Sequence, residues 1–101
     1  MAEFNNIPNE SISAFFDAVL SLETKEDCEK FFEDICTINE LISIAQRLEV
    51  AKLLNEGLTF SVIAEKTGAS TATIARVNKC IRYGAGGYSL VLGDKEDQEE
   101  N

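Results

Sequence analysis

The chain has 101 residues and contains no histidine, a single proline and only three cysteines. No run of apolar residues is long enough to cross a membrane, so we expect no membrane association. The cysteines have none of the spacings of a metal-binding motif, and the sequence therefore predicts no metal site. Without histidine, no nucleophile can be assigned together with a base. We therefore predict a protein that is not an enzyme and that needs no cofactor.

Two of the three cysteines are interpreted as ordinary packed side chains rather than redox-active residues or ligands. Cys28 and Cys36 lie on the apolar stripe of one expected helix, which predicts that they are small buried hydrophobic residues. The third is Cys80. The odd number of cysteines and the lack of a recognisable signal peptide lead us to expect a protein of the reducing cytoplasm.

Acidic residues outnumber basic residues by eighteen to nine, and the formal net charge is −9. The imbalance is uneven: residues 1–40 carry a net −8, residues 41–83 a net +3 and residues 84–101 a net −4. DNA binding depends on the electrostatic field near the phosphates, so a locally basic region can bind DNA even on an acidic protein. The acidic remainder should weaken binding to DNA of unrelated sequence.

Hydrophobic periodicity predicts one small, all-α domain over residues 10–92. Residues 1–9 are polar and expected to be flexible. Residues 93–101 form an acidic tail without apolar residues, which predicts disorder.

Two amphipathic helices are expected first, over residues 10–21 and 25–36, and Thr24 can cap the second. Each needs a partner surface for its apolar stripe. The stripe residues recur at i, i+3, i+4, i+7 and i+8: Ile12, Phe15, Phe16, Val19 and Leu20 in the first helix, and Cys28, Phe31, Phe32, Ile35 and Cys36 in the second.

A third helix is expected over residues 38–54, and it is unusually apolar. Thr37 and Glu40 form the sequence signature of a capping box at its start, and Gly57 provides a stop after its end. Its apolar residues spread around the helical wheel well beyond the single stripe of a surface helix. A chain this short has too little other material to bury such a helix. We therefore predict an obligate homodimer whose first three helices interlock.

Residues 59–83 match a helix-turn-helix, the unit that places its second helix in the major groove of DNA. Thr59 and Ser70 can cap the two helices. Gly68 stands where the turn needs a left-handed backbone, and Ala69 is expected to be buried inside the turn. The second helix returns to the core through Ile74, Val77 and Ile81.

The outer face of the second helix carries the predicted DNA contacts. Ser70 and the short side chains that follow it are candidates for DNA contacts, those of Thr71, Ala72 and Thr73 for base edges. Arg76 could contact a base or a phosphate, or could instead pair with a carboxylate of the protein. Phosphate contacts are expected from three further cations: Lys79, Arg82 and Lys66. The alternatives are that the lysines are solvated surface charges and that the motif is a helical hairpin without a nucleic-acid partner.

After Tyr83, the glycines at residues 84, 86 and 87 are expected to end the second helix. This glycine run is not a phosphate-binding loop, because it follows a helix rather than a strand and no P-loop lysine comes after it. The four apolar residues beyond the run are expected to pack back onto the domain, as a short helix or an extended segment: Tyr88, Leu90, Val91 and Leu92.

Residues 44–92 resemble the Trp repressor superfamily, and the branch called YerC/YecD is the most similar. The most specific piece is ATIAR, residues 72–76, within the sequence GASTATIAR. The similarity extends from the first expected helix to about Leu92. The resemblance implies a Trp repressor-like helical bundle: an intertwined homodimer with two helix-turn-helix heads that acts on transcription.

The resemblance also implies where the chain departs from Trp repressor, in which two arginines hold the indole of tryptophan. Arg76 matches one of them. Without gaps Gln46 matches the other, whereas a shift of one place would bring Arg47 there. Val77 replaces a glycine that lines the ligand slot, and Ser61 replaces a base-reading arginine. We therefore expect an effector that is absent or other than tryptophan, and a different operator.

The sequence thus predicts a regulator, interpreted as a repressor, that binds double-stranded DNA sequence-specifically as a symmetric dimer. Two recognition helices in successive major grooves require a roughly palindromic operator with half-sites about 34 Å apart. The alternative is a dimeric adaptor that acts on another component of transcription without reading bases. The acidic residues 1–40 and the acidic tail would suit a basic protein partner for such an adaptor.

Overall fold

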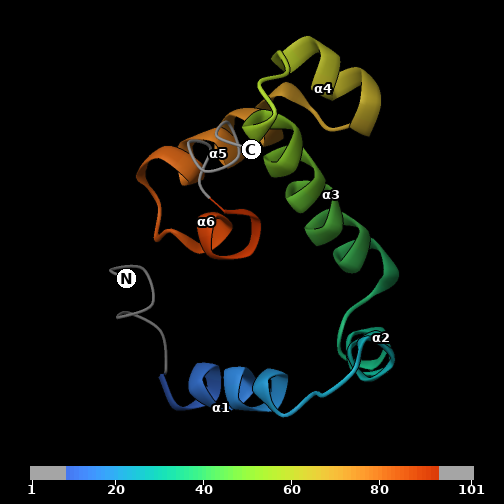
Figure 1. The fold of residues 1–101 in the computed structure, drawn as a ribbon. Coiled ribbons are helices and arrows are strands. Elements are labelled where there is room, and N and C mark those ends of the chain that lie inside the picture. The colour runs from blue at the N-terminus through green and yellow to red at the C-terminus, as the bar shows by residue number, and fades with distance from the viewer. Residues whose placement is uncertain (1–8, 94–101) are drawn as a thin grey trace. The chain divides into compact units, whose positions relative to one another are not determined.

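The computed structural model describes residues 9–93, which contain six α-helices and no β-strand (Figure 1). The predicted all-α class is confirmed. The expectations for a flexible start and a disordered tail fall largely on residues 1–8 and 94–101, outside the described range, although Asn9 opens the first helix. No helix within residues 9–93 is long and apolar enough to span a membrane. The helices are α1 (Asn9–Leu20), α2 (Lys25–Ile35), α3 (Ile38–Asn55), α4 (Phe60–Thr67), α5 (Thr71–Tyr83) and α6 (Gly87–Leu92).

The chain divides into two compact units, residues 1–41 and residues 42–101. In the first unit, α1 and α2 contact each other through aromatic rings. The ring centroid of Phe15 lies 6.1 Å from that of Phe31 and 6.4 Å from that of Phe32. Thr24 caps α2 as predicted, because its hydroxyl accepts a 3.0 Å hydrogen bond from the amide of Asp27.

Helices α1 and α2 contain no buried residue, so their apolar stripes are only partly covered. The side chain of Leu20 is 82% exposed and that of Ile35 is 50% exposed. Cys28 is exposed and Cys36 is half-buried, so the prediction that both are buried is wrong for the single chain. The physical reason is that the aromatic contacts between two short helices cover only part of each stripe.

The start of α3 is closed by the predicted capping box. The amide of Thr37 donates to Oε1 of Glu40 at 2.8 Å, and the amide of Glu40 donates to Oγ1 of Thr37 at 3.1 Å. Hydrogen bonding of the carboxylate to the backbone amide of Thr37 first, and to its side chain second, lowers the pKa of Glu40 below its usual value. At the other end, Gly57 adopts a φ of 87°, and the amide of Leu58 donates to the carbonyl of Leu53 at 3.2 Å. This closure is typical of helices that end at glycine.

The hydrophobic core lies in the second unit and joins α3, α4 and α5 around the helix-turn-helix. Its buried residues are Val50, Ala51, Ile63, Ala69, Ile74 and Val77. Ile81 is half-buried and packs against them, so all three predicted core residues of α5 reach this core. By contrast, four large apolar residues earlier in α3 are exposed: Ile38, Ile42, Ile44 and Leu48.

Helix α6 packs back onto this core through one face only. Tyr88 and Leu92 contact the core, whereas Leu90 is 89% and Val91 is 70% exposed. The prediction that all four apolar residues pack inward is therefore wrong for Leu90 and Val91. The segment forms a six-residue helix, and so short a helix cannot turn four of six side chains to the same side.

At Gly84, which follows α5, a Cβ atom would collide with the carbonyl of Cys80.

Candidate nucleic-acid interface

The turn between α4 and α5 is held by three consecutive residues, Gly68, Ala69 and Ser70. Gly68 is left-handed with a φ of 75°, and its amide donates to the carbonyl of Ala64 at 2.9 Å. Ala69 is only 5% exposed, and its amide donates to the hydroxyl of Thr67 at 3.1 Å. The hydroxyl of Ser70 accepts from the amide of Thr73 at 3.1 Å and so caps α5. The turn therefore fixes α5 relative to α4.

The first helix of the motif is capped in the same way. The hydroxyl of Thr59 accepts from the amide of Val62 at 3.3 Å, as the sequence predicts. Ser61 lies in the first turn of α4 and is exposed, with its hydroxyl 3.5 Å from that of Thr59. With Ile63 and Ile74 buried on the inner faces of α4 and α5, the motif presents the outer faces of both helices to solvent.

The first residues of α5 differ in their freedom to meet a ligand. Thr71 and Ala72 are exposed, whereas Thr73 is half-buried. The hydroxyl of Thr73 already accepts a 3.1 Å hydrogen bond from the hydroxyl of Ser70. Thr73 can still donate its own proton, but Thr71 and Ala72 are the residues most open to a base edge.

The cations of the motif are exposed and form no ion pair within residues 9–93. Arg76, Lys79 and Arg82 follow one another at intervals of three along α5, which contains no acidic residue. Lys66 is exposed in the last turn of α4. Within residues 9–93 the ion pair that forms lies elsewhere, between Lys30 and Glu26 on α2. The alternative that Arg76 pairs with a carboxylate of the protein is therefore not realised among the described residues.

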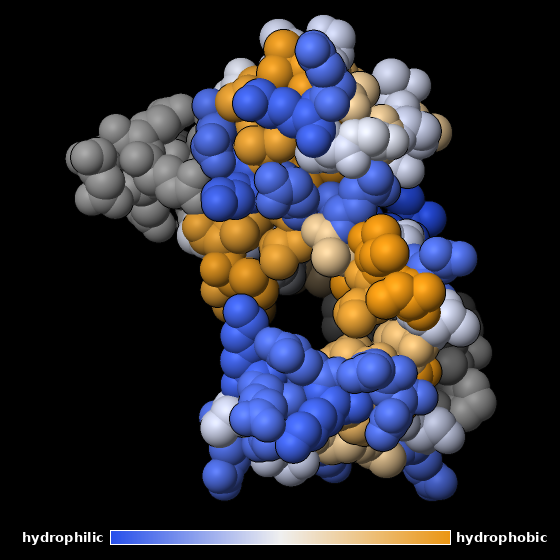
Figure 2. Space-filling model, turned by 90° about the vertical axis from the view of Figure 1, so that its right-hand side faces the viewer, coloured by the Kyte–Doolittle hydropathy of each residue, from blue (hydrophilic) through white to orange (hydrophobic). Residues whose placement is uncertain are grey.

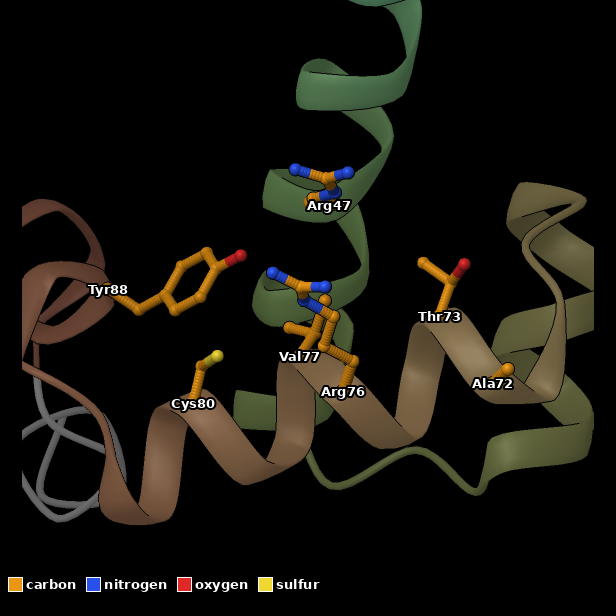
Figure 3. Close-up of a pocket in the computed structure, with 7 residues that line it drawn as sticks. All are labelled: Arg47, Ala72, Thr73, Arg76, Val77, Cys80 and Tyr88. Atoms are coloured by element: carbon orange, nitrogen blue, oxygen red, sulfur yellow. The ribbon is translucent and has the colours of Figure 1, made fainter. Parts of the chain in front are cut away.

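A cleft of about 330 Å³ lies beside α5 and contains a second arginine. In Figure 3 the guanidinium groups of Arg47, from α3, and Arg76, from α5, both point into the cleft, and the hydroxyl of Tyr88 faces them. The cleft thus contains Arg47, the residue that a shift of one place would match with the second arginine, and its lining does not include Gln46. Gln46 instead donates from Nε2 to the carbonyl of Thr67 at 3.2 Å.

Two further residues line this cleft without having been candidates for it, Cys80 and Tyr88, and Arg47 was named only through the shift of one place. The signal for Arg47 was present, because it stands three and four residues before the buried Val50 and Ala51 and so shares their side of α3. Tyr88 and Cys80 meet only through the fold, since α6 must turn back against α5. No periodicity within either helix predicts that contact.

The electrostatics of the cleft favour an anion and a neutral tyrosine. Burial raises the pKa of Tyr88, the nearby Cys80 adds to the rise, and Arg47 and Arg76 partly oppose it. The phenol is therefore a hydrogen-bond donor near neutral pH. Two guanidinium groups without an ion-pair partner among residues 9–93 give the cleft a positive field.

Comparison with known proteins decides the family. Residues 10–96 match the sequence profile of the family described as Trp repressor protein. The chain belongs to the Trp repressor family. Members of this family are DNA-binding regulators rather than enzymes, which agrees with the exposed, positively charged α5 of the helix-turn-helix.

One similar protein sequence and two solved structures support this assignment. The uncharacterized protein YerC of Bacillus subtilis (strain 168) is 44% identical over 97 residues, which cover 96% of this chain and 93% of YerC. A crystallised TrpR-like protein from Eubacterium eligens ATCC 27750 superposes with a TM-score of 0.83 and 52% identity, covering 86% of this chain and 90% of its own. A protein of Staphylococcus aureus whose structure is named for the Trp repressor gives a TM-score of 0.84 and 39% identity over 96% and 93% of the two chains.

Proposed function

We propose that the protein is a transcriptional repressor that binds double-stranded DNA sequence-specifically as a homodimer. The observation that carries the proposal is the exposed face of α5, which presents short side chains at its start and three cations without carboxylate partners among residues 9–93. This helix is fixed by the buried core of a helix-turn-helix in a member of the Trp repressor family. Such a helix can enter the major groove with its first residues against the base edges.

The residues have distinct proposed roles. Thr71 and Ala72 read base edges, with Thr73 donating where a base acceptor is in reach, and Ser70 holds the start of α5 against the DNA. Lys79 and Arg82 bind phosphates on one side of the groove, and Lys66 of α4 binds a phosphate on the other. Arg76 has access to both the DNA face and the cleft, so it contacts DNA while Arg47 remains inside the cleft.

The homodimer is supported by apolar surface that a single chain leaves uncovered. Figure 2 shows apolar patches open to solvent between hydrophilic areas. Exposed apolar residues occur on all three of the first helices, including Leu20 on α1, Ile35 on α2 and Ile42 on α3. We propose that residues 10–92 of two chains interlock through these helices. A twofold axis then requires a roughly palindromic operator with half-sites about 34 Å apart.

We further propose that the dimer acts in the cytoplasm and that any effector is not tryptophan. Val77 lines the cleft, and its branched side chain occupies space that a flat indole between Arg47 and Arg76 would need. Calorimetric titration with tryptophan should show no saturable binding. Saturation below about 1 mM, which corresponds to about −4.1 kcal/mol, would contradict this proposal.

The decisive experiment is an unbiased selection of DNA fragments by the purified protein at near-physiological salt. A double variant, Arg76→Ala with Lys79→Ala, serves as the matched protein, because both residues are exposed and neither belongs to the core. Enrichment of one palindromic motif by the natural sequence but not by the variant supports the proposal. Without any enriched motif, sequence-specific binding is refuted and the adaptor alternative gains support.

A further inference from the structure

Helix α5 ends beside a second groove, larger than the cleft that contains Arg47 and Arg76. This groove of about 440 Å³ lies between the α3–α4 connection, α5 and α6. Leu58, Phe60 and Ile81 form apolar parts of its lining, and Arg82 contributes the charged group. Gly93, the last described residue, also lines it. The chain therefore leaves the described structure at the groove that contains a cation of the DNA-binding face.

The segment that follows Gly93 has the opposite charge to this face. Residues 94–101 contain five acidic residues and one lysine, a net charge of −4. Helix α5 has three basic residues and no acidic residue, and its cations form no ion pair within residues 9–93. Acidic residues thus follow Gly93 directly in the sequence, and the cations of α5 form no ion pair within residues 9–93.

We propose that the acidic segment 94–101 docks on α5, beginning in the groove at Arg82, and competes there with DNA phosphates. The proposal rests on the DNA-binding function proposed above. Its occupant is this chain's own C-terminal segment, chosen because it begins at the groove and is complementary in charge.

The length of the segment suits this site. Eight residues extend over about 26 Å at about 3.3 Å per residue. Lys79 and Arg76 stand three and six residues before Arg82, which places them about 4.5 and 9 Å further along the axis of α5 at 1.5 Å per residue. The extended length of the segment therefore exceeds the axial distance over which the three cations are spread.

The consequence is greater sequence selectivity rather than a complete block of DNA binding. Exposed ion pairs are individually weak and screened by salt, so the docked segment exchanges easily with a stronger anion. Binding to unrelated DNA comes almost entirely from phosphate contacts, whereas an operator adds base contacts. Competition for the phosphate-binding cations therefore suppresses unrelated DNA first.

The first test compares three proteins on a short random-sequence duplex by fluorescence anisotropy. They are the full chain, a chain that ends at Gly93, and a full-length chain with a neutral tail (Asp94→Asn, Glu96→Gln, Asp97→Asn, Glu99→Gln and Glu100→Gln). Both variants should bind about tenfold more tightly at low salt, as expected if a tail at millimolar effective concentration occupies a site of about 0.1 mM affinity. The gain should shrink as salt rises. Equal affinities for all three proteins would overturn the proposal.

A double-mutant cycle separates docking from repulsion of DNA at a distance. The tail is neutralised once in the natural background and once together with Lys79→Gln and Arg82→Gln. Docking predicts that the gain falls from about tenfold to threefold or less, because the tail then has little to occupy. Repulsion at a distance acts on the DNA itself, so a gain that stays at about tenfold would overturn the docking proposal.

A measurement without DNA keeps the result independent of the proposed function. Backbone amide chemical shifts of the full chain and of the chain ending at Gly93 should differ over residues 76–93, and the differences should disappear at high salt. If no duplex binds but these shifts differ, docking stands and the DNA-binding proposal fails. Identical shifts would refute docking, as would differences that grow with protein concentration, which would assign the groove to a second copy.

Discussion

Replacement of Lys79 by glutamine tests the phosphate contacts of α5 most directly. Lys79 is exposed, lies outside the hydrophobic core and forms no ion pair with any residue of 9–93. Its substitution therefore removes one charge without opening a cavity or leaving a carboxylate unpaired. The expected effect is therefore on binding at the surface of α5 and not on the stability of the fold.

The size of this effect follows from counterion release. Each phosphate contact contributes about 0.9 to the slope of log K against log salt concentration. A dimer loses two such contacts, so the slope of Lys79→Gln should be less steep by about 1.8. Between 50 and 200 mM salt, a fourfold change, the natural protein should then lose about twelvefold more affinity than the variant.

The assay is a salt series of anisotropy titrations on the selected operator and on an unrelated duplex. Lys25→Gln is the matched control, since Lys25 is also an exposed lysine but lies at the start of α2, outside the helix-turn-helix. Its slope should equal that of the natural protein. A phosphate contact predicts an equal loss of affinity on both duplexes. An unchanged slope, or a loss confined to the operator, would refute the assignment of Lys79 to a phosphate.

Three further predictions concern the fold. Ile42→Asp should shift sedimentation at about 10 μM toward the monomer, because Ile42 is 57% exposed in the single chain and is proposed to be covered in the dimer. The control Asn39→Asp, on the same helix, should not. A dimer retained by Ile42→Asp would contradict the interlocked α3. Gly68→Ala should lower the free energy of unfolding by about 1–2 kcal/mol, because the left-handed φ of 75° opposes a Cβ although the space around it is open. The control Gly87→Ala, at a glycine without positive φ, should change the melting temperature little. Equal effects of the two substitutions would disprove the strain argument. Glu40→Gln should destabilise near neutral pH, and the difference should vanish in acid. The lowered pKa of Glu40 means that its contribution is complete above the ordinary carboxyl pKa and is lost as pH falls through the folded-state value; a pH-independent difference in urea unfolding would exclude the ionised cap.

Much of the fold could be predicted because the decisive signals are local. Thr24, Thr59 and Ser70 cap their helices as expected, since capping requires only a hydroxyl and an amide three residues later. Gly68 is left-handed as expected, because the turn needs that backbone and few residues other than glycine tolerate it. Neither kind of feature depends on what another part of the chain does.

The errors arose where a side chain depends on distant parts of the chain. Cys28 lies on a correct amphipathic stripe, yet the stripe is wider than the surface that one partner helix offers. Leu90 and Val91 were assigned inward because they are apolar, but only one face of α6 contacts the core. Residue matching left open whether Gln46 or Arg47 would lie beside Arg76. The structure places Arg47 in the cleft with Arg76, because Arg47 shares the side of α3 that carries the buried Val50 and Ala51.

Helix α5 combines its functions on different faces, and this arrangement makes them separable. Ile74 is fully buried in the core, whereas Lys79 is exposed on the other side of the helix. Ile74→Val should therefore lower the free energy of unfolding by about 0.5–1.5 kcal/mol and leave the salt slope of DNA binding unchanged. Lys79→Gln should leave the free energy of unfolding unchanged and make the salt slope less steep by about 1.8. If Ile74→Val altered the slope at temperatures where the protein remains folded, the core would be setting the phosphate contacts by moving α5, and the treatment of α5 as a rigid element would have to be abandoned.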